Sequence, residues 1–360
     1  MRIELKQVLC PQPKSKIKAS DGKLEGKYKF FTSSPMQTRF IDEANYDKPS
    51  LIFGTGGNAS VHFCDEPFST STDCLVMYGR NKIELESIYN YLKGNISLLE
   101  HGFKGAGLKH ISKDYILAIE IELPSEAMQH EFLQKNRIVD EIIEAKRTQL
   151  LLSEDLVKSR FIEMFGDPVY NTLKLPTKPL SELGSLDRGR SKHRPRNDPR
   201  LLGGPYPLIQ TGEVSNAGLY ITGYQNTYSE LGLKQSKMWK AGTLCITIAA
   251  NIAQTAILTF DACFPDSVVG FIPTDEINII YMHYWFSFFQ KILDEQAPQV
   301  AQKNINLKIL SELQVAIPSI EEQSDFATFV EQVDKSKFEI QQSLEKLEIL
   351  KKSLMQQYFG

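Results

Sequence analysis

Two long stretches of the chain have the residue pattern of extended helices. Residues 124–165 and 319–359 contain no Gly or Pro after the initial Pro124, and they are rich in Glu, Lys, Gln and Leu, which favour helix. In the second stretch apolar residues recur every seven positions, as in a coiled coil: Phe326, Val333, Ile340, Leu347 and Leu354. Val330, Leu344 and Tyr358 add the alternate position of this seam, which Lys337 and Lys351 interrupt. Each stretch predicts one helix of about 40 residues, roughly 60 Å long.

The residues at the ends of both stretches support these boundaries. Pro124 and Pro318 suit a first helical turn, where the missing N–H costs nothing. Ser125 and Ser319 offer capping oxygens. Gly166 stands where a C-terminal left-handed residue is expected.

The first helix carries more apolar surface than one partner helix requires. One stripe and its alternate positions are Ile138, Ile142, Ala145, Leu152 and Leu156. A second stripe is Ile143, Leu150, Val157 and Met164. We expect the two helices to pair as an antiparallel coiled coil within the chain, and the remaining apolar surface to dock another protein.

The chain is an internal repeat. Residues 124–166 align without gaps to residues 318–360, with 13 identities over 43 positions. The alignment continues upstream, where Leu51, Asn58 and Asp73 correspond to Leu244, Asn251 and Asp266, and Tyr28 to Tyr206. The first copy lacks about 15 residues between Tyr28 and Leu51. The predicted domains are therefore a globular unit at 1–123, a helix at 124–166, a globular unit at 167–317 and a helix at 318–360.

The globular units mix short strands with short helices. Apolar runs that predict buried strands are residues 51–53, 115–121, 244–248 and 315–317, whereas residues 83–92 and 279–293 predict helices. Regular βαβ alternation is not evident, so the predicted fold class is α+β, with two domains in internal repeat.

Positive charge is concentrated in one segment of the chain. The 360 residues are 42% hydrophobic with a net charge of −3, an ordinary globular composition that excludes a uniformly basic surface. Residues 187–200 nevertheless hold six positive side chains, with His193 in addition, against Asp187 and Asp198. These side chains are Arg188, Arg190, Lys192, Arg194, Arg196 and Arg200. Pro195 and Pro199 predict a loop there.

The first unit has a matching basic loop. Its positive side chains are Lys14, Lys16, Lys18, Lys23, Lys27 and Lys29, against Asp21 and Glu25. Each loop has a local net charge of +4. One such loop alone is more simply a solvated surface loop, but two at matching places indicate a nucleic-acid-binding surface.

Polar residues after matching strands are candidates for base contacts. Asn58, Asn251 and Gln254 carry amides, which can pair with an adenine edge, although Asn after a strand is also ordinary turn chemistry. Lys109, His110, Lys303 and Asn304 precede the last strand of each unit and are candidates for phosphate or base contacts, the alternative being exposed loop charge.

No stretch of the sequence predicts an active site. The chain has no P-loop, no Asn-Pro-Pro-Tyr or Asp-Pro-Pro-Tyr tetrapeptide, no GxSxG turn and no HExxH or paired CxxC motif. The five cysteines are expected to be free thiols in a reducing cytoplasm. The most apolar stretch, residues 277–289, is too short for a membrane span and predicts a buried helix.

Two segments near the end of the second globular unit resemble those of a known family. Residues 317–323, Ile-Pro-Ser-Ile-Glu-Glu-Gln, and residues 301–306, Ala-Gln-Lys-Asn-Ile-Asn, are similar to the segment in which a recognition domain of the specificity subunits of type I restriction–modification systems leads into its long helix. Residues 123–129 keep the Pro and the Gln but have Met128 in place of the acidic residue. The resemblance covers essentially the whole chain.

The resemblance implies a non-catalytic, sequence-specific DNA-binding subunit in the cytoplasm, without a membrane partner. Each globular unit would read one half of a bipartite target in double-stranded DNA, and the two helices would set the spacing. Two methyltransferase subunits would dock on the chain, and restriction subunits would complete the complex. The chain itself would hold no cofactor, since S-adenosylmethionine, ATP and magnesium would be on the partners.

Two alternative functions fit the sequence less well. A fused restriction and methylation enzyme would need a catalytic module, for which no stretch of the chain remains. A coiled-coil scaffold that binds protein alone would leave the two basic loops without a role.

Overall fold

The computed structural model describes residues 2–360 apart from 80, 106, 108, 250–251 and 289–304. Within the described residues the chain forms two compact units. Unit 1 consists of residues 1–148 and 340–360, and unit 2 of residues 149–339. Two helices of 40 residues, α4 (Glu126–Phe165) and α11 (Ile320–Phe359), each contribute to both units. The prediction of two long helices is confirmed.

Among its described residues, unit 1 contains three small sheets and three α-helices besides its parts of α4 and α11. A two-stranded antiparallel sheet pairs β1 (Arg2–Glu4) with β9 (Glu120–Glu122), directly before α4. A four-stranded sheet has the order β2 (Leu9–Pro11), β8 (Cys74–Gly79), β5 (Ser50–Gly54), β6 (Val61–Cys64). A three-stranded sheet has the order β4 (Arg39–Ile41), β3 (Tyr28–Phe31), β7 (Phe68–Thr70). The helices are α1 (Lys82–Gly94), α2 (Ser97–Glu100) and α3 (Lys113–Leu117), and 3-10 turns lie at Leu5–Gln7 and Ala19–Asp21.

Unit 2 repeats this plan with additional strands. Its two-stranded sheet pairs β10 (Thr177–Pro179) with β20 (Gln314–Ala316), directly before α11. A five-stranded sheet has the order β11 (Gly184–Arg188), β19 (Val268–Pro273), β16 (Leu244–Thr247), β17 (Thr255–Leu258), β13 (Tyr220–Ile221). A four-stranded sheet has the order β14 (Asn226–Tyr228), β12 (Leu202–Leu208), β18 (Ala262–Cys263), β15 (Met238–Trp239). The helices are α5 (Leu180–Leu183), α6 (Thr211–Asn216), α7 (Glu230–Lys234), α8 (Ile279–Phe286) and α10 (Leu307–Glu312), with a 3-10 turn at Pro199–Leu201.

The structural repeat confirms the repeat in the sequence. In both units the central strand, β5 or β16, pairs antiparallel with its two neighbours, and a parallel pair, β3–β7 or β12–β18, forms in the other sheet. The extra residues of unit 2 lie between β12 and β16, where they form α6, β13, α7 and β15. This is the place where the sequence alignment puts the deletion in unit 1.

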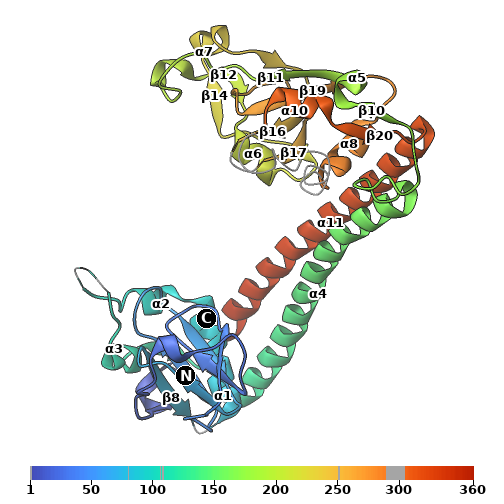
Figure 1. Ribbon diagram of the computed structural model, residues 1–360. Coiled ribbons are helices and arrows are strands. Elements are labelled where there is room, and N and C mark those ends of the chain that lie inside the picture. The colour runs from blue at the N-terminus through green and yellow to red at the C-terminus, as the bar shows by residue number, and fades with distance from the viewer. Residues whose placement is uncertain (1, 80, 106, 108, 250–251, 289–304) are drawn as a thin grey trace. The chain divides into compact units, whose positions relative to one another are not determined.

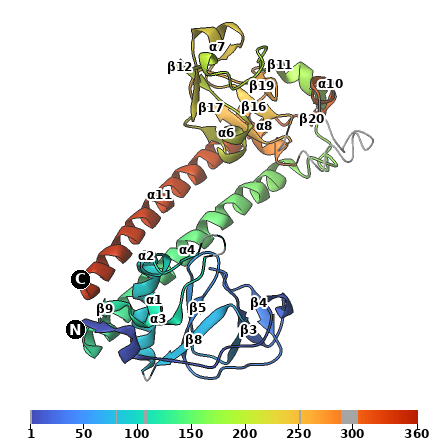
Figure 2. The ribbon, with the colours of Figure 1, turned by 90° about the vertical axis from the view of Figure 1, so that its left-hand side faces the viewer.

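The helices α4 and α11 run antiparallel, as predicted (Figures 1 and 2). In unit 1, Lys135 Nζ donates to the Tyr358 hydroxyl over 3.0 Å and Lys351 pairs with Asp140. In unit 2, Lys337 lies 3.9 Å from Glu154. Residue numbers thus rise along α4 as they fall along α11. The two lysines that interrupt the predicted seam are therefore paired with carboxylates of α4.

The structure decides which stripe of α4 is buried. Ile143 and Val157, from the second stripe, are buried. The first stripe is largely exposed: Ile138 by 57%, Ile142 by 40%, Leu152 by 60% and Leu156 by 52%. Within each unit α4 therefore presents apolar surface that the described residues leave uncovered.

The spacing between the Pro and the Gln at the start of the long helix is the same in both copies of the repeat and has a structural explanation. The Gln129 and Gln323 side chains are buried, and each Nε2 donates to the carbonyl of the Pro five residues earlier, Pro124 at 2.9 Å and Pro318 at 3.0 Å. The helices begin at Glu126 and Ile320, so the placement of the two prolines in the first turn is wrong. They precede the helix and supply an acceptor to it.

The prediction of one strand over residues 115–121 is wrong for its first part, residues 115–117. Residues Lys113–Leu117 form α3, and only Glu120–Glu122 form a strand, β9. The Ser112 hydroxyl accepts from the Tyr115 N–H and caps the helix, while the Ile116 side chain is fully buried. A local cap and a short-range burial therefore override the β propensity of this run.

Candidate nucleic-acid interface

In unit 1 the structure brings the basic loop and the predicted polar residues to one end of the four-stranded sheet. The turn between β7 and β8 connects them. Thr72 N donates to the Ile17 carbonyl of the basic loop over 2.9 Å, and the Asp73 carbonyl accepts from Thr55 N at 2.9 Å. His110 Nδ1 lies 3.1 Å from the Thr55 carbonyl. Thr55 opens the β5–β6 turn that carries Asn58.

The predicted site residues at this end of the sheet are accessible. Lys14, Lys16, Lys18, Asn58, Lys109 and His110 are all exposed. Among the residues that the structure describes, Lys14, Lys16 and Lys18 make no ion pair, whereas Lys23 pairs with Asp42 and Lys29 with Glu66. The three lysines nearest the β7–β8 turn are thus available for an external anion.

Unit 2 has the same arrangement around Asp266, the repeat equivalent of Asp73. The Asp266 carbonyl accepts from Arg188 Nη2 over 2.7 Å, and the neighbouring Ser267 carbonyl accepts from Ile248 N at the end of β16 over 3.0 Å. The β18–β19 turn therefore joins the basic loop to the strand after which Asn251 follows. Asn251, Lys303 and Asn304 lie outside the described residues.

Gln254 lies apart from the other predicted site residues of unit 2. Its side chain is exposed and lines a cavity of about 350 Å³ together with Glu154 of α4 and Lys337 of α11. Its backbone N–H donates to Thr247 Oγ1 over 3.0 Å. No described contact joins Gln254 to the basic loop.

Carboxylates pair with three of the six positive side chains of the unit 2 loop, and a backbone carbonyl binds a fourth. Asp266 pairs with Arg196 and lies 3.7 Å from Arg194, in addition to its backbone contact with Arg188. Asp198 binds Arg200 at 2.7 Å, and the Arg200 guanidinium holds the pKa of this carboxyl well below its usual range.

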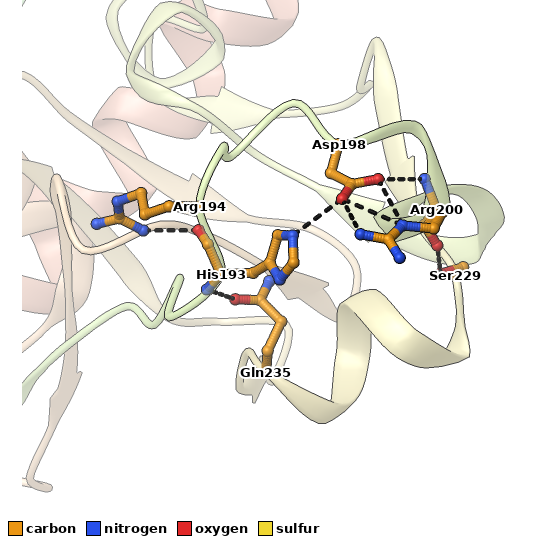
Figure 3. A network of polar contacts seen from close by, with 6 residues as sticks. All are labelled: His193, Arg194, Asp198, Arg200, Ser229 and Gln235. Atoms are coloured by element: carbon orange, nitrogen blue, oxygen red, sulfur yellow. Dashed lines mark hydrogen bonds and ion pairs between the residues drawn. The ribbon is translucent and has the colours of Figure 1, made fainter.

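Figure 3 shows the hydrogen bonds that order this loop. His193 Nε2 lies 2.9 Å from Asp198, and the His193 N–H donates to Gln235 Oε1 over 3.1 Å. The Ser229 hydroxyl donates to the Arg200 carbonyl over 2.8 Å. Hydrogen bonds with the two residues that flank α7, Ser229 and Gln235, therefore anchor the loop.

Arg190 and Lys192 are exposed and make no ion pair among the described residues. Their charges are therefore available to an external anion. The structure also adds Lys237, which pairs with Asp187 at 2.8 Å and lies 3.9 Å from the centre of the Trp239 ring. Lys237 adds one positive charge and Asp266 one negative charge, so the local net charge remains +4.

Sequence reasoning missed Lys237 and the pairing role of Asp266. The alignment of Asp266 with Asp73 already marked this position, but its ion pairs join residues about 70 apart in the chain. Lys237 has no counterpart in the shorter unit 1, so the repeat gave no indication of it.

The described residues contain no group of three or more His, Cys, Asp or Glu that could hold a metal ion. The five cysteines are free thiols. No helix among the described residues is long and apolar enough to cross a membrane.

Two α+β domains in repeat, each followed by a long helix and each carrying a basic loop at one end of its sheet, define a DNA-recognition protein. A family model for the type I restriction modification DNA specificity domain matches residues 2–152 and 175–351. The chain belongs to this family, and its role is DNA sequence recognition.

Solved structures share this fold. One is the S subunit of a type I restriction–modification system from M. genitalium, with 16% identity, a TM-score of 0.62, and coverage of 100% of this chain and 96% of that chain. Another comes from work on complex assembly and conformational transition of the type I R-M system, with 15% identity, a TM-score of 0.62, and coverage of 99% and 97%. At these identities the likeness supports the fold, which agrees with the predicted α+β repeat.

Proposed function

We propose that the chain is the specificity subunit of a type I restriction–modification complex and that each unit reads one half of a bipartite target in double-stranded DNA. The observation that carries this proposal is that both units build the same arrangement. A basic loop, a strand-end turn and the turn at Asp73 or Asp266 meet at one end of the sheet in each.

The chemistry of the chain in this role is binding and positioning. Exposed lysines and arginines contact phosphates and set the register, while side chains with both donors and acceptors contact base edges. The helices α4 and α11 set the distance between the half-sites. The chain contributes no catalytic group, and S-adenosylmethionine, ATP and magnesium belong to partner subunits.

The exposed apolar stripe of α4 supports the proposal of protein partners. Side chains such as Ile138 and Leu152 are more than half exposed, which is unusual for Ile and Leu on a helix whose opposite face is packed. Two methyltransferase subunits dock on the long helices in this proposal, and restriction subunits join them.

The salt dependence of DNA binding tests the role of the basic loop. Replacing Arg190 and Lys192 by Ala in the full chain should weaken binding to all sequences and lower the slope of log K against log salt by up to about two, since each neutralised phosphate contributes about 0.9. The change Lys308→Ala, at a side chain that is 82% exposed on α10, is the matched control and should leave the slope unchanged. If the double variant keeps the wild-type slope, the loop does not contact phosphates.

The length of the helices tests the spacing role. Four residues inserted after Glu144 add about 6 Å of helix, nearly two base pairs at 3.4 Å each, and keep the apolar stripe close to its original phase. The methylated target of the assembled complex should keep both half-sites and lengthen its nonspecific centre. Full-rate methylation of the original spacing by the insertion variant would refute this role. An insertion of two residues should break the helix pairing instead, because it rotates the stripe by about 200°.

A further inference from the structure

A cavity lined by both apolar and polar side chains lies beside the basic loop of unit 2. It has a volume of about 320 Å³ and lies between loop residues Ser191, Arg196 and Asn197 and the strands that carry Leu208 and Asn226. Gln210, which follows β12, also lines it. The cavity therefore joins the candidate phosphate-binding loop to the face of the four-stranded sheet.

Several polar groups of this cavity lack partners. The Ser191 side chain is only 7% exposed, and its hydroxyl has no hydrogen-bond partner in the described part of the chain. In the same part, the side-chain amides of Asn197 and Asn226, which also line the cavity, make no hydrogen bond. A buried hydroxyl without a partner is unfavourable, so it is the kind of group that a ligand satisfies.

The chemistry of these groups selects the class of ligand. A phosphate offers acceptors alone and would leave the amide oxygens unpaired. A nucleobase edge offers donors and acceptors side by side, and Asn or Gln pairs bidentately with the N6 and N7 of adenine. Arg196, whose side chain is 48% exposed and paired with Asp266, lies at the edge of the same cavity.

The repeat identifies the equivalent position in unit 1. In unit 2, Leu208 pairs with Asn226 on one side and with Cys263 on the other. In unit 1, Phe30 pairs with Arg39 on one side and with Ser69 on the other. The sequence offsets that relate Tyr28 to Tyr206 also relate Phe30 to Leu208, so Arg39 occupies the place of Asn226.

Arg39 lies beside its own basic loop. A Cβ atom built on Gly22, within that loop, would be 3.2 Å from the Arg39 Cβ, and the Lys23 and Phe40 backbones exchange two hydrogen bonds of 2.9 Å. The Arg39 side chain is exposed and makes no ion pair among the described residues. Arginine pairs bidentately with the O6 and N7 of guanine.

We infer that this strand position reads one base in each half-site, with Asn226 selecting adenine in one half and Arg39 selecting guanine in the other. The inference rests on the proposed function, because it needs each unit to read its own half-site. It names the residues and the bases that the proposed function leaves open.

Exchange of the two residues tests the inference. The full chain is incubated with randomised DNA duplexes, and the bound fraction is sequenced. Asn226→Arg should replace adenine by guanine at a single position of one half-site and shift the preference between the two bases by roughly tenfold or more. Arg39→Asn should produce the reverse change at a single position of the other half-site.

Two further variants are controls, one for a loss of folding and one for a general loss of affinity. Asn226→Asp keeps the shape of the side chain and removes its donor, so it should lose the adenine preference while the fluorescence of Trp239 and Trp285 in unit 2 stays native. Lys192→Ala should lower affinity for every duplex without changing the enriched sequence.

The outcomes separate this inference from the proposed function. If the wild-type chain enriches a bipartite sequence and folded Asn226→Arg and Asn226→Asp chains enrich the same one, Asn226 does not read a base and the inference fails alone. If the wild-type chain enriches no bipartite sequence, the proposed function fails and the inference fails with it.

Discussion

The two units fasten their α+β domains to the long helices by partly different chemistry. In unit 1, α1 packs one ring on a long helix, Tyr91 on Phe359 at 5.2 Å, and its contact with α4 includes polar pairs. Arg137 binds Glu86 through both carboxylate oxygens, and the buried Asn136 donates to Asn90. In unit 2 the equivalent contact is aromatic, with Tyr284 packed edge-on against Phe326, their centroids 5.5 Å apart. By the repeat, Asn136 corresponds to Val330.

Some contacts are nevertheless the same in both units. Phe132 packs edge-on against Phe359 at 5.1 Å in unit 1, and the repeat-related Phe326 packs edge-on against Phe165 at 5.5 Å in unit 2. The comparison teaches that the repeat preserves an aromatic pair that joins the two helices, whereas the contact of α4 or α11 with the recognition domain differs at the polar pairs. A backbone arrangement constrains volume and pattern more tightly than side-chain identity.

The largest effect is expected at the aromatic residues common to both units. Phe326→Ala should cost about 3–5 kcal/mol of stability, because a fully buried ring with three aromatic partners is lost. Both tryptophans, Trp239 and Trp285, are buried in unit 2, so urea unfolding followed by tryptophan fluorescence reports on that unit. Phe132→Ala should cost a similar amount in unit 1, measured by hydrogen exchange, and leave the fluorescence midpoint nearly unchanged. Equal shifts of that midpoint would show that the two units unfold together.

Replacing each of the two buried glutamines should destabilise the two units by different amounts. Gln323 Oε1 accepts from Asn278 N over 2.8 Å, and its Nε2 donates to the Glu276 and Pro318 carbonyls, while Gln129 donates to one carbonyl alone among the described contacts. Gln323→Leu should therefore cost about 2–3 kcal/mol and Gln129→Leu about 1, because more buried groups lose their partner in unit 2. Hydrogen exchange of the first turns of α4 and α11 measures both. Equal losses would contradict the asymmetry.

A smaller difference is expected at the helix N-termini. Ser319 and Glu322 form a capping box, in which the Ser319 hydroxyl accepts from Glu322 N and the Glu322 carboxylate accepts from Ser319 N. Ser319→Ala should cost about 1 kcal/mol. Met128→Glu should stabilise the start of α4 by about 0.5–1 kcal/mol, since it creates the same pattern after Ser125. Thermal unfolding of the single variants provides the comparison, and Glu322→Met should reverse the effect in unit 2.

The smallest effect concerns pH. The folded-state pKa of Asp198 lies below its usual range because Arg200 hydrogen bonds to the ionised carboxyl, so its contribution to stability is present above the unfolded pKa of about 3.9. This contribution is lost as the pH falls through the folded pKa. Asp198→Asn should therefore loosen the unit 2 loop at neutral pH, measured as faster exchange of the Arg200 amide. The difference from the wild type should shrink as the pH is lowered below about 4.

The sequence by itself determined the periodic and local features. Helix length, helix ends, the repeat, most strands and both basic loops follow from patterns that extend over a few turns or a few residues, because propensity, capping and burial periodicity act at that range. The run at residues 115–121 shows where such reasoning fails, since apolar residues alone do not distinguish a short buried helix from a strand.

The tertiary structure decided which surfaces and charges remain free. Both stripes of α4 are apolar in sequence, and only packing within the fold showed that Ile143 is buried and Ile138 exposed. Likewise, six positive side chains in one loop look equivalent until Asp266, far along the chain, neutralises Arg194 and Arg196 and leaves Arg190 and Lys192 facing solvent. These outcomes depend on contacts between residues distant in sequence, whose energies no local pattern contains.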